Sequence, residues 1–341
     1  MTTIKPEVRK TNFLLILARF RELALIGFIL LLVIVISLQS PSFLTFSNFR
    51  DILMDISILA MIALAQAMII ITRGIDLSVA SMLGLTAMMV AFLIRAYPQT
   101  PMVLIVLLGV GLGIVLGSLN GLIITLGKVP PIIATLGTLS IFRGMIFLYS
   151  KGNWINPFQL PLDFKQLAKG APLGLPNLVI VAIIVAVIAY IFLNYAQIGR
   201  DIYALGTNPE AAKISGIRTE RVTFMVYVIS GAVCGLAGVM WASRYEAAQT
   251  NTALGFELQT VAAAVIGGVS MMGGIGTVPG VLLGALLLGI IQNGLTLSSI
   301  SPFWQLAVQG FLILLAVSSD SSIQQRIKQT MTRGIVNDRH G

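Results

Sequence analysis

Residues 102–126 read MVLIVLLGVGLGIVLGSLNGLIITL, an unbroken run of 25 residues without a charged side chain. A helix needs about 20 mostly apolar residues to cross the hydrocarbon core of a bilayer. Within the run, Gly113, Gly117 and Gly121 recur at every fourth position. That spacing of small residues lets two membrane helices approach closely. The stretch therefore predicts a transmembrane helix that packs tightly against another helix.

The same pattern extends along the whole chain. Of the 341 residues, 57% are hydrophobic and 10% are charged, whereas a soluble domain carries about 25% charged residues. We expect an all-α polytopic membrane protein that forms one transmembrane domain over residues 1–341. Its ten predicted spans are roughly 23–38, 52–72, 77–94, 102–126, 130–149, 177–195, 222–242, 258–273, 278–296 and 303–319.

Glycines leave one part of this topology open. Gly267, Gly268, Gly273, Gly274 and Gly276 fall in or beside the spans 258–273 and 278–296. Because glycine destabilises helix interiors, this region fits two spans, half-helices or a re-entrant hairpin.

The positions of Lys and Arg predict the orientation, since cytoplasmic loops carry an excess of both. With the N-terminus in the cytoplasm and spans alternating, 15 of the 22 basic residues lie inside, six lie outside, and Arg143 lies within a span. The first apolar run is followed by polar and bulky residues from Gln39 to Phe43, without a small-residue cleavage site, so we expect it to be retained. We predict a multi-pass protein of a bacterial inner membrane with both termini cytoplasmic.

Several function classes are disfavoured. Cys234 and His340 are the only cysteine and histidine, so we expect no metal site, no catalytic constellation and no cofactor. The net charge of +9 is spread singly between apolar runs, which fits basic loops beside a membrane and not a nucleic-acid surface. Gly121 to Lys128 departs from the spacing of a phosphate-binding loop, and Val129 stands where Ser or Thr is needed to bind magnesium. Any ATP hydrolysis is expected on another chain.

The longest hydrophilic stretch on the predicted cytoplasmic side is 196–221. Inside it, Asn208 suits a helix N-cap, Pro209 the first helical position and Glu210 the first turn. Ala211, Ala212, Lys213, Ile214 and Ser215 continue the helix, and Gly216 suits its left-handed end before Ile217. A helix of about two turns is too short to be stable alone in water. We expect its small apolar face, Ala211, Ala212 and Ile214, to dock onto another surface; an ordinary structured loop is the alternative.

This stretch and three others resemble one family. The segment from Gly199 to Ile217, with its GTNPEAAKISGI core, is similar to the coupling segment of permease subunits in bacterial ABC importers for ribose, xylose, arabinose, rhamnose and autoinducer-2. GIDLS at 74–78, PPIIATLGT at 130–138 and the glycine-rich stretch 267–276 resemble further signatures in the same order. The resemblance implies a permease that works with a second permease subunit, identical or homologous, with two cytoplasmic ATPase subunits and with a periplasmic solute-binding protein. It implies import of a sugar or sugar-like solute by alternating access.

Polar residues within spans are candidates for the substrate pathway, because charged and polar groups in a membrane usually face protein or water. Asp76 either gates the pathway or caps the start of a helix. Arg143 either contacts solute, pairs with Asp55 or extends to the outer headgroups. Five polar residues within spans either line the path or bond across helices; they are Asn120, Thr135, Thr138, Gln292 and Asn293. Glu257 is a further candidate, as an outer gate position that matches Asp76 in the internal repeat described below.

An internal echo suggests two inverted repeats, about 40–149 and 196–319. GIDL at 74–77 recurs as GFEL at 255–258, and Asn120-Gly121-Leu122 recurs as Asn293-Gly294-Leu295. Many transporters are built from such repeats. Chance matches in a glycine-rich apolar sequence are the alternative.

Two rival functions remain. In a secondary transporter, an intramembrane acid such as Asp76 or Glu257 would carry a proton. A membrane-embedded enzyme is disfavoured because the chain has no His, Cys or paired-acid constellation.

Overall fold

The computed structural model describes residues 9–172 and 174–301, together with 304, 307, 310, 311 and 314, and side chains from residue 22 on. In these residues every regular element is a helix, apart from an isolated β-bridge between Ile155 and Ala248. The elements are α1 (Arg9–Gln39), η1 (Pro41–Leu44), α2 (Phe46–Ile71), α3 (Val79–Ala96), α4 (Met102–Thr125), α5 (Pro131–Ser150), η2 (Pro157–Gln159), α6 (Leu162–Lys169), α7 (Asn177–Tyr195), α8 (Gln197–Thr207), α9 (Pro209–Ile214), α10 (Thr219–Tyr245), α11 (Phe256–Ile266) and α12 (Val278–Leu297).

Length and hydropathy confirm a polytopic all-α membrane protein. In the described part of the chain, eight helices are long and apolar enough to cross a bilayer: α1, from Glu22 on, and α2, α3, α4, α5, α7, α10 and α12. They correspond to eight of the ten predicted spans. The predicted span 303–319 lies largely outside the described residues.

The predicted span 258–273 is not a continuous helix. α11 ends at Ile266, and residues 267–277 form turns with Gly268, Gly273 and Gly274 at positive φ. At 1.5 Å per residue, the 11 residues of α11 are about 16 Å long, half of a bilayer core. The half-helix alternative is therefore correct for this segment.

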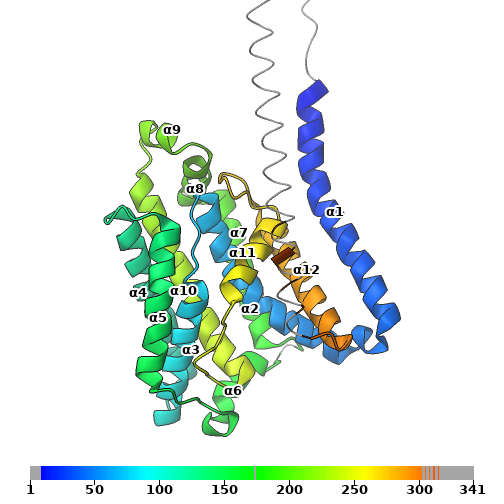
Figure 1. Cartoon of the computed structure of the whole chain (residues 1–341), viewed down its shortest axis with the longest axis vertical. Coiled ribbons are helices and arrows are strands. Elements are labelled where there is room, and N and C mark those ends of the chain that lie inside the picture. Colours follow the sequence, from blue (N-terminus) through cyan, green and yellow to red (C-terminus); the bar gives the residue numbers. More distant parts are fainter. Residues whose placement is uncertain are drawn as a thin grey trace, which may run out of the picture.

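The core is built around α2 and α10, which run antiparallel. Tyr245, at the end of α10, contacts Asp55 in the first half of α2, while Tyr227 near the start of α10 lies against Gly74, just after α2. α2 is almost entirely buried, and α10 packs on α2, α3 and α4. Figure 1 shows α9 and α6 at opposite ends of the molecule, referred to below as the α9 end and the α6 end.

The glycine stripe of α4 serves this packing, as predicted. A Cβ on Gly113 would lie 2.1 Å from the Gly231 carbonyl oxygen of α10, and one on Gly117 would lie 2.3 Å from the Tyr227 carbonyl oxygen. Since no side chain fits there, the two helices cross backbone to backbone.

At the α6 end, a loop and α6 cover the bundle. Ser243 of α10 accepts a hydrogen bond from the Ala168 amide and donates one to the Phe164 carbonyl. Glu246 forms ion pairs with Lys165 and Lys169. The Lys169 ammonium holds the pKa of Glu246 below its usual value, because it bonds the charged carboxylate.

Candidate functional site

Residues 208–216 fold as their sequence predicts, whereas α8 just before them was not predicted. The Asn208 side chain accepts hydrogen bonds from the amides of Glu210 and Ala211, both at 3.1 Å, and α9 begins at Pro209. Gly216 ends the turn with φ +85°, and the amide of Ile217 donates to the Ala212 carbonyl at 3.0 Å. These contacts place a capped helix of six residues at the α9 end of the molecule (Figure 1).

The three alanine and isoleucine residues of α9 do not share one environment. Ala212 is buried, at 4% exposure, whereas Ala211 is exposed and Ile214 is 88% exposed. The three residues therefore do not form one exposed face: Ala212 is buried against its own chain, and Ala211 and Ile214 are exposed. An isoleucine in water at a helix end is available to another surface.

α8 connects α9 to the residues that follow α2 and α11. Arg73, which follows α2, donates from Nε to the Gly206 carbonyl at 2.6 Å and from Nη2 to the Thr207 carbonyl at 2.8 Å. Tyr203 donates to the Gly276 carbonyl at 2.8 Å, in the turn after α11. The residues after α2 and the turn after α11 are thus bonded to the same short helix.

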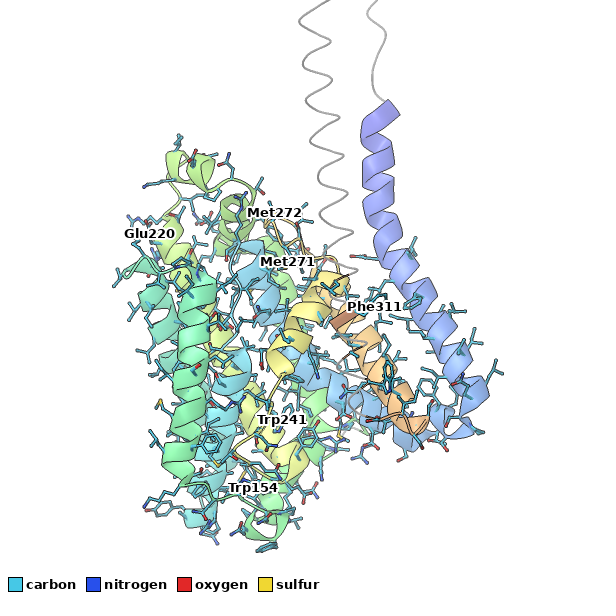
Figure 2. All side chains as sticks on the ribbon, viewed as in Figure 1. Trp154, Glu220, Trp241, Met271, Met272 and Phe311 are labelled. Carbon is cyan, nitrogen blue, oxygen red and sulfur yellow. The ribbon has the colours of Figure 1, made fainter. Side chains whose placement is uncertain are left out.

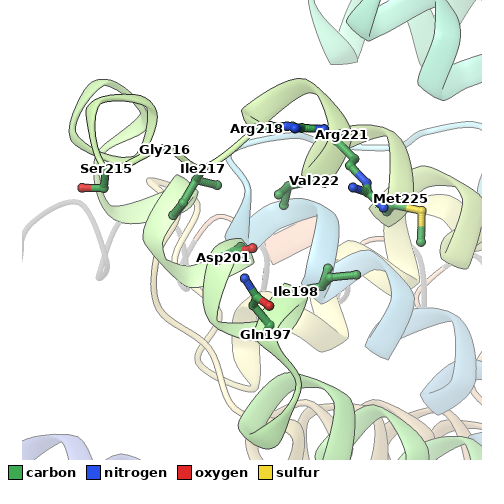
Figure 3. Close-up of a pocket in the computed structure, with 10 residues that line it drawn as sticks. All are labelled: Gln197, Ile198, Asp201, Ser215, Gly216, Ile217, Arg218, Arg221, Val222 and Met225. Atoms are coloured by element: carbon green, nitrogen blue, oxygen red, sulfur yellow. The ribbon is translucent and has the colours of Figure 1, made fainter.

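A cavity of about 550 Å³ lies between α8, the link after α9 and the start of α10. Figure 3 shows Arg218 and Arg221 on one side of it and Gln197, Ile198 and Asp201 of α8 on another. The cavity leaves α9 standing away from the bundle, with Ile217 at its wall.

Four of the predicted pathway residues meet in a buried polar cluster. Oδ1 of Asp76 accepts from the Ser78 amide at 2.8 Å and from the Ser78 hydroxyl at 2.6 Å, and Asn120 donates to Ser78 Oγ at 2.8 Å. Thr135 donates to the Ile75 carbonyl at 3.2 Å. Thr138, 4% exposed, lies one turn further along α5 and donates to the Thr135 carbonyl at 3.4 Å.

Asp76 thus bonds both the amide and the hydroxyl of Ser78, the residue before α3, and its whole side chain is buried. Within the described part of the structure, its second oxygen, Oδ2, has no hydrogen-bond partner, and neither has Asn120 Oδ1. A capping role leaves these two acceptors unexplained, because buried polar atoms are normally bonded.

Two further members of the cluster were not predicted. With its side-chain nitrogen facing the Asp76 carbonyl, Gln66 donates to that carbonyl at 3.1 Å and accepts from the Asp76 backbone amide at 3.2 Å. The Tyr227 hydroxyl lies against Gly74 and is buried, with no hydrogen-bond partner among the residues that the structure describes. Gln66 had a sequence signal, as the one amide in the apolar run 52–71; Tyr227 had none, because it is one of several aromatic residues in apolar helices.

Arg143 does not pair with Asp55. Its guanidinium Nη1 donates to the Thr252 carbonyl at 2.7 Å, in the non-helical stretch before α11, and Asp55 pairs with Arg244 at 3.5 Å. Arg143 and Glu257, in the first turn of α11, interact electrostatically. Glu257 Oε2 and Arg143 Nε are buried without hydrogen-bond partners. Arg143 therefore ties α5 to the broken span and does not extend to the headgroups.

Asn293 lies apart from both groups. Its side-chain amide exchanges two hydrogen bonds with that of Asn48, at 2.8 and 3.1 Å, which joins the end of α12 to the start of α2. Seven of the predicted pathway residues thus fall in three places: the Asp76 cluster, the Arg143–Glu257 pair and the Asn48–Asn293 pair. Among the described residues, no group of three His, Cys, Asp or Glu side chains is placed to hold a metal ion.

Comparisons with known proteins cover most of the chain. The family described as branched-chain amino acid transport system / permease component matches residues 48–317. The chain is 40% identical to the ribose import permease protein RbsC of Bacillus subtilis over 85% of its own length and 89% of that protein. It is 36% identical to the galactose/methyl galactoside import permease protein MglC of Haemophilus influenzae over 87% of its own length and 93% of that protein. No solved structure matches it significantly.

Proposed function

The chain belongs to the family of branched-chain amino acid transport system permease components, and from this membership we propose that it forms the membrane pathway of an ATP-driven sugar importer. The sugar assignment rests on the relatives, which are named as ribose and as galactose or methyl galactoside import permeases. As a permease component, the chain is a transport protein and not an enzyme.

We base the proposed coupling to ATP hydrolysis on the conformation of α9 and the exposure of its residues. The helix is capped, held by buried Ala212, and presents Ile214 at 88% exposure away from the bundle. A surface with this chemistry fits an apolar cleft on a cytoplasmic ATPase subunit. The contacts of α8 with Arg73 and Gly276 would carry the motion of that subunit to the bundle. The coupling residues are Asn208, Pro209, Glu210, Ala211, Ala212, Ile214, Gly216 and Ile217.

The remaining partners follow from the same proposal. A second permease subunit, identical or homologous, completes the pathway, two ATPase subunits bind the α9 ends, and a solute-binding protein delivers sugar at the α6 ends. The protein then lies in a bacterial inner membrane with both termini in the cytoplasm, and the α9 end is the cytoplasmic end.

For the pathway we propose that the Asp76 cluster is an inner gate in its closed form. The unpaired acceptors on Asp76 and Asn120 would bind solute or water when α3, α4 and α10 separate. Arg143 and Glu257 occupy the matching position on the outer side.

Packing supports the two inverted repeats proposed for the same chain. α2 and α10 are the first membrane-spanning helices of the two proposed repeats. α10 packs on α3 and α4 of the first repeat, and α2, antiparallel to it, packs on α11 and α12 of the second repeat. Superposing the spans of 52–149 on those of 222–319 should require an axis in the membrane plane; an axis along the membrane normal, or no superposition, would contradict the repeat.

Transport by purified components tests the proposed function. The permease is purified with the ATPase and binding protein that accompany it and is reconstituted into liposomes, and uptake of radiolabelled ribose, galactose and leucine is measured. We expect sugar uptake that requires ATP and survives an ionophore. Uptake that follows an ion gradient without ATP would identify a secondary transporter, and uptake of leucine alone would contradict the sugar assignment.

A further inference from the structure

The α6 end of the molecule contains a second cavity, of about 350 Å³, which lies apart from the Asp76 cluster. Its walls come from the first half of α2, the end of α10, the start of α11 and the second half of α12. We call it the outer vestibule and define it by Asp55, Trp241, Tyr245, Asn251, Gln259 and Gln292. Ligand sites in proteins are typically cavities of about 300–1,000 Å³, so a small solute fits.

The vestibule is lined by polar groups at membrane depth. Asp55 lies nine residues into α2, about 13 Å from its start, and its side chain is about half exposed. A carboxylate and several amides on a lipid-facing surface would be costly, so such groups face water or protein. We infer that the vestibule is filled with water and opens at the α6 end.

Free hydrogen-bonding groups converge on it. In the described part of the chain, the side-chain amides of Asn251, Gln259 and Gln292 make no hydrogen bond to another residue. Each offers both donors and an acceptor. Solute hydroxyls both donate and accept, and therefore complement amides more fully than a purely charged group would.

Aromatic rings form one wall. The rings of Trp241 and Tyr245 lie 4.7 Å apart at 45°, and Phe256 meets Trp241 edge to face at 5.3 Å. Figure 2 shows Trp241 on α10, toward the α6 end. An indole face beside amides offers a flat apolar surface to the C–H face of a sugar ring, while the amides bind its hydroxyls.

The charges in the vestibule favour a neutral solute. Asp55 is already paired: Tyr245 donates to its Oδ1 at 3.2 Å, and Arg244 lies 3.5 Å from the same oxygen. A zwitterionic amino acid would need one free cation and one free anion to replace its hydration. The Arg244 guanidinium is shared between Asp55 and Asp51, at 3.5 and 3.3 Å, so it is not free to bind a solute carboxylate.

We propose that the outer vestibule is a solute subsite within the permease, which holds one neutral polyhydroxylated molecule such as an aldopentose or aldohexose before it reaches the Asp76 cluster. The inference rests on the proposed function, because it deepens the assignment of the solute. Trp241 stacks on the ring, and Asn251, Gln259 and Gln292 bind the hydroxyls.

Cysteine labelling tests the proposal directly, because Cys234 is the sole cysteine and is buried. In a Cys234→Ala background, Gln292→Cys reports from the vestibule and Phe158→Cys reports from the outer loop, where Phe158 is 83% exposed. Intact spheroplasts are treated with a membrane-impermeant thiol reagent, alone and with D-ribose, D-galactose or L-leucine.

We expect both cysteines to be labelled from outside. One of the two sugars should slow labelling of Gln292→Cys about tenfold when present at about ten times its dissociation constant. Leucine should leave the rate unchanged, and no additive should affect Phe158→Cys. Adding Trp241→Ala to the Gln292→Cys variant should weaken the protection, because the stacking surface is lost.

Three results would overturn the proposal: no labelling of Gln292→Cys from outside, equal labelling with and without both sugars, or protection by leucine alone. ATP-dependent sugar uptake by the reconstituted assembly is measured in parallel, so that failure of the subsite can be told apart from failure of the proposed function. Normal uptake without protection would remove the subsite and leave the importer assignment intact.

Discussion

Truncating Ile214, the exposed isoleucine of α9, should weaken the binding of the ATPase subunit to the permease. Ile214 is 88% exposed in the chain alone, so almost its whole side chain is available for burial in an ATPase cleft. Ile214→Ala removes three carbon groups at about 0.8 kcal/mol each, about 2 kcal/mol after allowing for the part already covered. At 1.4 kcal/mol per factor of ten, the ATPase subunit should bind about 30-fold more weakly.

The assay is titration of purified ATPase onto permease in nanodiscs, with binding and solute-stimulated ATP hydrolysis both measured. Leu162→Ala is the matched control, because Leu162 is 68% exposed at the opposite end of the molecule. Unchanged binding by Ile214→Ala, or equal weakening by Leu162→Ala, would refute α9 as the docking element. Ala212→Asp is the poorer test, since Ala212 is buried and its substitution disturbs the segment itself.

Three further predictions concern topology, packing and pH. A reporter active only in the periplasm should be active when fused at Lys165 and silent at Lys213; the reverse pattern would invert the orientation. Gly113→Ala places a Cβ 2.1 Å from a backbone oxygen and should lower the melting temperature in detergent, whereas Gly111→Ala, with open space around it, should not; equal melting of both variants would contradict the close crossing. Since the pKa of Glu246 is lowered in the folded state, its stabilisation is present above about pH 4.5 and is lost as pH falls through the lowered pKa. Glu246→Gln should therefore lower the melting temperature at pH 7, and the two proteins should converge in acid; a constant difference would exclude the ion pairs as its source.

Most membrane-spanning helices were predictable, because a span is defined by the length and hydropathy of its own residues. The cap of α9 was predictable for a similar reason: Asn208, Pro209 and Gly216 each bond or bend the backbone within the same few residues. The glycine stripe of α4 indicated a close crossing, although it did not identify α10 as the partner.

What the sequence left open depends on contacts between distant segments. Arg143 binds a backbone carbonyl of Thr252, and carbonyls carry no signature in a sequence. The direction of Ile214 depends on which side of a two-turn helix meets the bundle, and its apolar residues alone do not define one face. The outer vestibule brings together residues from four helices that are separated by up to about 240 positions, none of which forms a motif.

The contact of Gly206 in α8 with Ile71 and Gly274 affects how movement is transmitted through this protein. A Cβ on Gly206 would lie 1.8 Å from the Ile71 carbonyl oxygen and 2.5 Å from the Gly274 amide nitrogen, so three stretches of main chain touch without side chains between them. Side chains at a joint can change rotamer and absorb displacement, whereas main-chain atoms in contact cannot. The contact therefore allows little relative movement, and a displacement of α8 moves the end of α2 and the turn after α11 with it. A larger residue at position 206 would force these three stretches of main chain apart, so we expect it to lower the melting temperature and to misalign α8 with the end of α2.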